Sequence, residues 1–180
     1  MPKEGSLRHM LRRETRAEHD AVEAAMGDVD VVTDAGIERF CLVHELAARK
    51  LIAAGADTLP SENLVRIASK LLATDLHELG RASLPLTACP ERGEPAGLTY
   101  VMAGSRLGNQ IMLRHWRTAT SSRVAKAGSY LTSTSLDEGA KAFLKKLDTV
   151  QLDRLADEGE SILAGALLGF RLFREAAKSV

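Results

Sequence analysis

Four residues near the start of the chain have types and spacing that could support ligand chemistry. Arg12, Arg16, His19 and Glu23 follow the three/four spacing of neighbours on one side of a helix. A neutral imidazole nitrogen of His19 is a potential iron ligand, and the Glu23 carboxylate one turn later is placed to orient it. The two arginines are suited to binding carboxylates of the same ligand. The spacing alone favours a simpler alternative, a solvated helix face with ion pairs between neighbouring turns.

A second unusual stretch, residues 97–115, combines helical periodicity with glycine. Gly104 and Gly108 lie four apart on one face, and each costs a helix interior about 1 kcal/mol relative to alanine. Glycines at such positions allow another surface to approach the backbone closely. From these residues we favour a tight crossing with a second helix, and a seat for a flat ligand is the alternative. The same row of the helix carries Gly97, Val101, Met112 and His115.

The elements that must position these residues are all predicted to be helices. Apolar residues recur at helical spacing, and no sustained alternating pattern, hairpin turn or repeat occurs. The predicted helices cover residues 7–26, 33–55, 60–80, 97–115, a stretch that begins at Ser135, and 149–177. Loops are predicted at 81–96 and after Trp116. We therefore expect an all-α protein with a single domain.

Capping residues mark the predicted helix boundaries, and the second helix has a distinct apolar stripe. The boundaries are marked by Ser6, by Thr33 or Asp34, by Gly55, by Pro60 with Ser61, and by a capping box of Ser135 with Glu138. Cys41 and His44 fall within the apolar stripe of the second helix. We therefore expect both side chains to be packed in the core rather than to act as ligands.

Composition limits the classes of function. The 180 residues suit one domain, and 24 basic against 24 acidic residues give no net charge, so no nucleic-acid partner is expected. Cys41 and Cys89 belong to no metal-binding spacing, as in proteins of a reducing compartment. No apolar run approaches the roughly 18 residues of a membrane span, and the charged N-terminal residues do not resemble a signal peptide. We expect a cytoplasmic protein with no membrane partner.

Three segments carry a resemblance to a known family. Arg-Arg-Glu-Thr-Arg-Ala-Glu-His-Asp-Ala-Val-Glu, at 12–23, resembles the proximal helix of the haem oxygenases, and Tyr-Val-Met-Ala-Gly-Ser-Arg-Leu-Gly-Asn-Gln, at 100–110, resembles their kinked distal helix. Leu-Leu-Gly-Phe-Arg-Leu-Phe-Arg-Glu-Ala, at 167–176, is similar to the family's last helix. The chain looks most like the bacterial members, which serve iron acquisition or occur beside bacteriophytochromes. The resemblance implies a fold that holds haem between the proximal and distal helices.

The resemblance also implies an activity. Haem oxygenases cleave haem to biliverdin, carbon monoxide and iron, so haem is both cofactor and substrate. The reaction requires O2 and electrons from an external electron donor, which is a ferredoxin or a reductase. A bacteriophytochrome that receives the biliverdin is a further implied partner.

Carried over residue by residue, the resemblance assigns roles in a haem site. His19 is the implied iron ligand, and Glu23 is its outer partner. The backbone at Gly104 and Gly108 is implied to make bound O2 lean toward a meso carbon of the haem. The residues implied to lie near the haem propionates are Arg12, Arg16, Tyr100, Lys141 and Lys145.

Two positions depart from the family pattern. The animal enzymes have an aspartate where this chain has Ser105, so the Ser105 side chain or the Arg106 backbone is expected to hold the distal water. Asn109 follows Gly108 where the family usually has glycine or alanine. The Asn109 amide could crowd the haem, change which meso carbon is attacked, or donate a hydrogen bond to bound oxygen. The sequence leaves these three effects open.

Other functions remain open from the sequence. One is a catalytically impaired protein of the same fold that binds haem or a bilin, for which Asn109 is the main argument. A second is a thiaminase-like or di-iron helical enzyme, and a third is a helical adaptor without a site. A di-iron site requires Glu-x-x-His spacing. The residues three positions before the five histidines are not acidic; they are Ser6, Arg16, Cys41, Thr74 and Met112.

Overall fold

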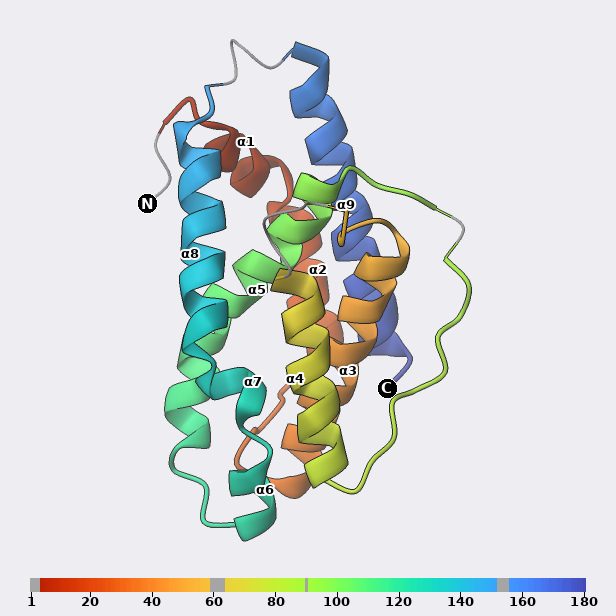
Figure 1. The fold of residues 1–180 in the computed structure, drawn as a ribbon, viewed down its shortest axis with the longest axis vertical. Helices are drawn as coiled ribbons and strands as arrows, with labels where there is room; N and C mark the ends of the chain where they lie inside the picture. The colour runs from red at the N-terminus through yellow and green to blue at the C-terminus, as the bar shows by residue number, and fades with distance from the viewer. Residues whose placement is uncertain (1–3, 59–63, 90, 152–155) are drawn as a thin grey trace.

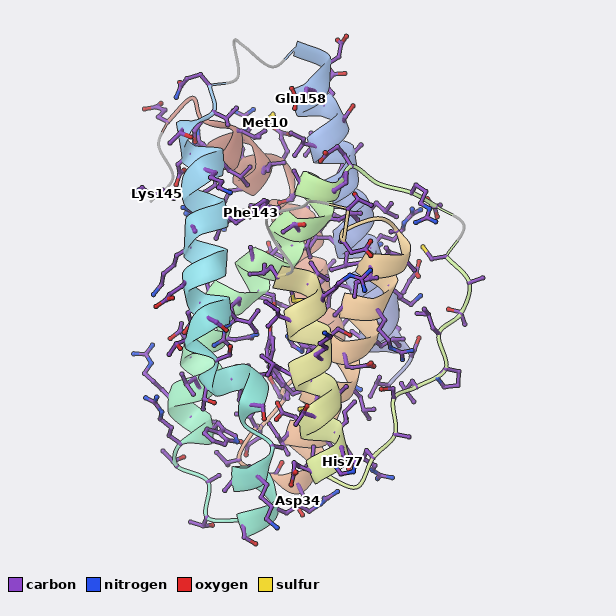
Figure 2. The ribbon with its side chains drawn as sticks, viewed as in Figure 1. Met10, Asp34, His77, Phe143, Lys145 and Glu158 are labelled. Carbon is purple, nitrogen blue, oxygen red and sulfur yellow. The ribbon has the colours of Figure 1, made fainter. Side chains whose placement is uncertain are left out.

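The computed structural model describes residues 4–58, 64–89, 91–151 and 156–180, and helices joined by loops make up these ranges (Figures 1 and 2). The helices are α1 (Leu7–Glu14), α2 (Arg16–Met26), α3 (Asp34–Ala53), α4 (Leu64–Glu78), α5 (Pro95–Trp116), α6 (Ser122–Lys126), α7 (Ser129–Thr132), α8 (Thr134–Thr149) and α9 (Ala156–Lys178). The strand-type pairing in the described residues is limited to one isolated bridge, between Ser6 and Gln151. None of these helices combines the length and apolar character needed to cross a membrane. The predicted all-α class is confirmed.

α1 and α2 replace the single helix predicted for residues 7–26. Ser6 is the N-cap, as predicted, because its Oγ accepts a hydrogen bond from the backbone N–H of His9 at 3.2 Å. The helix is interrupted at Thr15, whose hydroxyl donates to the Leu11 carbonyl at 2.7 Å. A side-chain bond of this kind competes with the helical hydrogen bonds and bends the chain. The break leaves the first arginine of the predicted row on α1 and the other three residues on α2.

The starts of α3 and α5 follow from side-chain caps. Thr33 caps α3, one of the two predicted alternatives, because its Oγ1 accepts from a first-turn N–H at 3.1 Å. α3 ends at Ala53, two residues before the predicted Gly55. α5 begins at Pro95, two residues earlier than predicted, and the Glu94 carboxylate caps it. The predicted start of the third helix at Pro60 and Ser61 lies outside the described residues.

The predicted capping box at Ser135 and Glu138 is wrong. Ser133 caps α8 instead, because its Oγ accepts from the Leu136 N–H at 3.3 Å. Both serines fit a capping pattern in the sequence, but only Ser133 has the extended backbone of an N-cap, and Ser135 lies in the first turn. Its hydroxyl contacts the Ser133 hydroxyl at 3.1 Å.

The last predicted helix, 149–177, also begins too early. α8 continues through Thr149, and Gln151 forms the isolated bridge with Ser6, so the chain leaves the helix there. The described part of the last helix, α9, starts at Ala156. Residues 152–155 of the predicted helix lie outside the described residues.

α9 supports the two helices that carry the predicted site. It packs against α2, α3 and α5, and α5 also packs against α8 (Figure 1). Buried apolar side chains from these helices form one continuous hydrophobic core. The positions of α2 and α5 relative to each other are therefore set through α9.

α5 and α9 cross so closely that their backbones are in contact. A Cβ atom at Gly97 would lie 2.1 Å from the carbonyl oxygen of Ile162, and one at Gly165 would lie 2.6 Å from that of Glu94. Only glycine fits such an approach without moving the backbone. The tight helix crossing predicted for the glycine row therefore exists, but it is made by the first glycine of the row.

We predict opposite stability effects of alanine at two glycines of α5. Gly97→Ala places a methyl group against the α9 backbone and should lower the free energy of unfolding by about 1–3 kcal/mol, the scale of an overpacked core. Gly104→Ala is the matched control, because nothing lies within 4 Å of its added Cβ. The control should raise the free energy of unfolding by up to about 1 kcal/mol through helix propensity. Urea unfolding measures both, and equal effects would contradict the crossing.

Candidate functional site

Residues of α2 and α5 face one another across a cavity of about 680 Å³. This volume lies in the range of roughly 300–1,000 Å³ that is typical of small-molecule sites. Residues from α1, α3, α8 and α9 complete the lining, so segments distant in the sequence meet there. The predicted site residues that line the cavity are Arg12, His19, Glu23, Tyr100, Gly104, Ser105, Gly108 and Asn109. Those that do not are Arg16, Arg106, Lys141 and Lys145.

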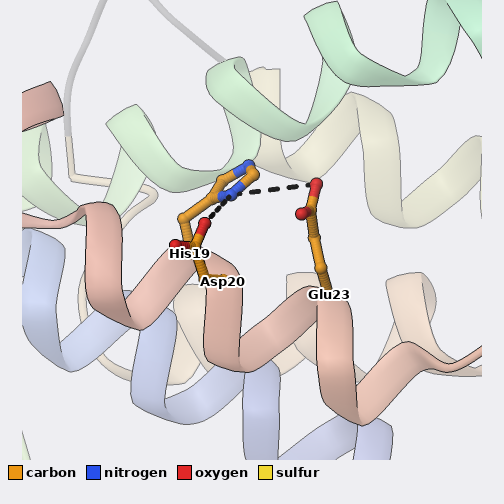
Figure 3. A group of neighbouring side chains, drawn as sticks. All are labelled: His19, Asp20 and Glu23. Carbon is orange, nitrogen blue, oxygen red and sulfur yellow. Dashed lines mark ion pairs between the residues drawn. The ribbon is translucent and has the colours of Figure 1, made fainter.

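His19 forms the centre of the α2 wall. Its side chain is 54% exposed and extends from α2 toward α5 (Figure 3). The His19 Nδ1 lies 3.7 Å from Asp20 Oδ1 and 3.8 Å from Glu23 Oε1. Both distances exceed those of a hydrogen bond, so the carboxylates attract a positive ring without fixing the ring. The imidazole ring meets the Phe170 ring edge-on, with centroids 6.1 Å apart. A ring held this loosely is free to bind a ligand.

The same three side chains are the group of potential metal ligands that the described residues bring together. One ligand atom each of His19, Asp20 and Glu23 lies within 4.8 Å of the others, and all three side chains are exposed. They come from one turn of one helix, whereas di-iron sites place Glu-x-x-His pairs on facing helices. The described residues contain no second group of this kind, so the di-iron alternative gains no support.

The α5 wall has exposed backbone at two glycines. Gly104 and Gly108 are exposed, both line the cavity, and nothing lies within 4 Å of a Cβ built on either. The helix crossing that we favoured from their spacing is therefore wrong at these two positions, because no helix approaches them. Val101 and Met112 of the same row also line the cavity. His115 does not, since its Nε2 lies 2.8 Å from Asp30 Oδ1 in the α2–α3 loop.

One end of the cavity is cationic. Arg8, Arg12 and Tyr100 all line this end. Burial raises the pKa of Tyr100, while a hydrogen bond with Thr15 and the charges of Arg8 and Arg12 act in the opposite direction. Arg8 Nη1 also lies 2.7 Å from Asp148 Oδ2, which anchors α1 to α8. The arrangement suits a ligand with carboxylates at one edge. The sequence analysis missed Arg8, although it lies four residues before Arg12 on the same helix face.

Four predicted residues take other positions. Arg106 is only 1% exposed and points away from the cavity: it donates to the carbonyls of Leu131 and Ser133 and forms an ion pair with Asp137 at 2.8 Å. Its side chain therefore ties α5 to α7 and α8. The other three have exposed side chains that do not line the cavity; they are Arg16, Lys141 and Lys145.

The floor of the cavity is aromatic and contains a buried histidine. His44 is 4% exposed, as predicted for a core residue, and it also lines the cavity with Phe40, Phe170 and Phe173. Its Nδ1–H donates to the Phe40 carbonyl at 2.9 Å, and its ring packs on Phe40 and edge-on to Phe173. Burial lowers the pKa of His44 to about 4, although the bond to Phe40 acts in the opposite direction. At neutral pH the ring is uncharged, so its Nε2 is an acceptor.

Ser105 and Asn109 form the polar edge of the α5 wall. The Asn109 Nδ2 donates to the Tyr130 hydroxyl oxygen at 3.2 Å, and Ser105 interacts with the same hydroxyl. Tyr130 belongs to α7 and is buried behind the wall. The amide of Asn109 is thus tied toward the core. This contact was not predictable from the sequence, because α7 is 21 residues away along the chain.

These walls define what the cavity can bind. The His19 imidazole lies on one side, α5 lies opposite with exposed backbone at Gly104 and Gly108, and the floor is apolar apart from one neutral histidine. Positive charge is concentrated at the end formed by α1 and the start of α5. A flat, mostly apolar molecule with acidic groups at one edge and a metal at its centre fits each of these features.

We predict that His44 makes stability depend on pH. The pKa of His44 is about 4 in the folded protein and near 6.5 when unfolded, so below pH 6.5 the unfolded chain binds the proton more tightly. Stability is therefore lost as the pH falls from about 6.5 toward 4. His44→Phe removes this titration and should reduce the stability difference between about pH 7.5 and pH 5 by about 2 kcal/mol. Urea unfolding at both pH values tests it; an unchanged difference would contradict a neutral buried ring.

Comparisons with known proteins do not identify a family for this chain. A scan against protein-family models gave no match, and a search of curated proteins gave no match either. The function is therefore argued from the cavity and its residues.

Proposed function

We propose that the protein is a haem oxygenase, which cleaves haem to biliverdin, carbon monoxide and iron. One observation carries the proposal: the His19 side chain and the bare backbone at Gly104 and Gly108 line the same cavity from opposite helices. The two segments lie some 80 residues apart, and each had a simpler explanation when considered alone. Their meeting across a ligand-sized space supports the haem site that the sequence resemblance implies.

The lining residues fit haem in charge as well as in shape. Haem is a flat apolar ring with two propionates at one edge, and Arg8, Arg12 and Tyr100 gather at one end of the cavity. Arginine binds carboxylates through paired N–H donors, and a tyrosine hydroxyl adds one more. The aromatic floor provides apolar contact for the rest of the ring. Arg8 replaces Arg16 in this proposal as the second arginine.

The roles of the protein in the reaction follow from these positions. When bound, haem supplies the iron chemistry that activates O2 at the expense of electrons from an external ferredoxin or reductase. His19 binds the iron, and the nearby Asp20 and Glu23 carboxylates favour electron donation from its ring. On the α5 side of the cavity, Gly104 and Gly108 would leave space next to the haem, and neither carries an acidic or basic side chain. In fold terms, α2 is the proximal helix and α5 the distal helix of a haem oxygenase-like fold.

A catalytically impaired haem- or bilin-binding protein of the same fold is the second candidate. Asn109 favours it, because its amide follows Gly108 directly and adds, with Ser105, a polar edge to the α5 wall. Turnover separates the two candidates. Purified protein with haem, O2 and a reductant should lose its Soret band and gain biliverdin absorption if it is an oxygenase. A stable Soret band under these conditions would establish the binding protein instead.

We predict that His19→Ala weakens haem binding by at least about tenfold, because even changes around a metal ligand cost about 10–100-fold. The matched control is His77→Ala, at an exposed histidine near the end of α4 that does not line the cavity (Figure 2). The measurement is a haem titration followed at the Soret band. If the His19 variant binds haem with the wild-type spectrum and affinity, His19 is not the iron ligand.

We also predict that Gly108→Leu blocks haem binding without unfolding the protein. The new side chain would project into space that is open now, so it occupies the cavity instead of displacing a neighbour. Ala142→Leu, at an exposed position of α8, introduces the same side chain away from the cavity and should leave haem binding unchanged. Circular dichroism checks folding and a haem titration checks binding. A Gly108 variant that binds haem normally would contradict the α5 wall.

A further inference from the structure

Tyr130 is a rigid, buried group directly behind the α5 wall. It is 1% exposed, and its backbone N–H donates to the Asp75 carboxylate at 2.9 Å. The Arg106 guanidinium lies 5.1 Å from the centre of its ring, and the Phe40 ring packs 6.1 Å away on another side. Contacts from α3, α4 and α5 thus hold the phenol in one orientation. A group fixed in this way can in turn fix the side chains bonded to it.

The Tyr130 hydroxyl accepts a hydrogen bond from Asn109, a polar side chain of the wall. Its own proton points to the Met102 sulfur at 3.9 Å, which leaves the oxygen to accept from Asn109 Nδ2 at 3.2 Å. Burial raises the pKa of Tyr130, so the hydroxyl keeps its proton at neutral pH. The bonds from Asn109 and Ser105 act on that pKa in the opposite direction, as donors to the oxygen do.

The orientation of the Asn109 amide follows from this bond. The amide carries its N–H donors at one end and its acceptor oxygen at the other, and the nitrogen end is held against Tyr130. Asn109 also lines the cavity, and its side-chain hydrogen bond within the described residues uses the nitrogen, not the oxygen. Ser105, one turn before Asn109 on the same wall, also interacts with the Tyr130 hydroxyl. Both side chains lie one residue after a wall glycine.

We propose that Tyr130 is a positioning residue that makes the α5 wall an acceptor of hydrogen bonds. The cavity then binds ligands that donate a hydrogen bond more tightly than anions, which can only accept one. The selected ligand is the small molecule bound to haem iron on the side opposite His19, so this inference rests on the proposed function. A bound water molecule can donate a hydrogen bond to this wall. Fluoride can only accept hydrogen bonds, and the N–H donors of the wall are directed toward Tyr130 in the core.

The test compares fluoride binding to the ferric, haem-loaded protein in wild type and Tyr130→Phe at fixed pH. The variant keeps the ring and its packing but releases Asn109 and Ser105 to present N–H and O–H donors. Fluoride affinity should rise at least about tenfold, the effect of one hydrogen bond to a charged group. Two further variants provide the control: the double variant Ser105→Ala with Asn109→Ala, and the triple variant that adds Tyr130→Phe. Their fluoride affinities should be equal, because neither contains the released donors.

The outcomes separate this inference from the proposed function. A wild-type protein without a haem spectrum would overturn both. Normal haem binding with fluoride affinity unchanged or reduced in Tyr130→Phe would overturn only the acceptor wall. A second measurement needs no haem and no variant: by NMR, the Asn109 side-chain amide protons of the haem-free wild type should exchange with solvent more slowly than those of free asparagine. Exchange at the free rate would overturn the bond to Tyr130, and with it the inference.

Discussion

The backbone contact between α5 and α9 is the constraint on which the rest of the structure depends. Gly97 and Gly165 allow the two helices to approach without side chains between them. α2 packs against the same helix α9, so a single element fixes both walls of the cavity. Further along α5 no helix approaches Gly104 or Gly108, and the space between α2 and α5 remains open. Protein interiors are close-packed, so a space of this size persists only where packing at other positions holds the helices apart.

The distribution of charge in the cavity follows from solvation. Arg8 and Arg12 lie at one end of the cavity, where Arg8 forms an ion pair with Asp148. At the floor, His44 is enclosed by Phe40 and Phe173, and there the neutral form of the imidazole is the stable one. A ligand that is charged at one edge and apolar over the rest of its surface matches this gradient.

Sequence reasoning succeeded where a local pattern has one meaning. The helical class, the caps Ser6 and Thr33 and the core position of His44 all follow from spacing and side-chain chemistry. It failed where one pattern allows two structures. The glycine row predicted a helix crossing, which occurs only at the first glycine. Two serines near the start of α8 could act as its cap, and the wrong one was chosen. The Arg106 side chain is turned into the core, because residues adjacent in a helix face different directions, and the expected role of its backbone beside the distal water stays a prediction.

The sequence by itself determined which residues share a helix face, because helical periodicity is local: His19 with Glu23, and Gly104 with Gly108, lie together whatever surrounds them. Only the tertiary structure decided what each face meets. It set the two faces across one cavity, brought Arg8 to its charged end, and tied Asn109 to Tyr130 behind the wall. These contacts join segments far apart in the chain, and their geometry depends on how whole helices pack, which no local pattern encodes.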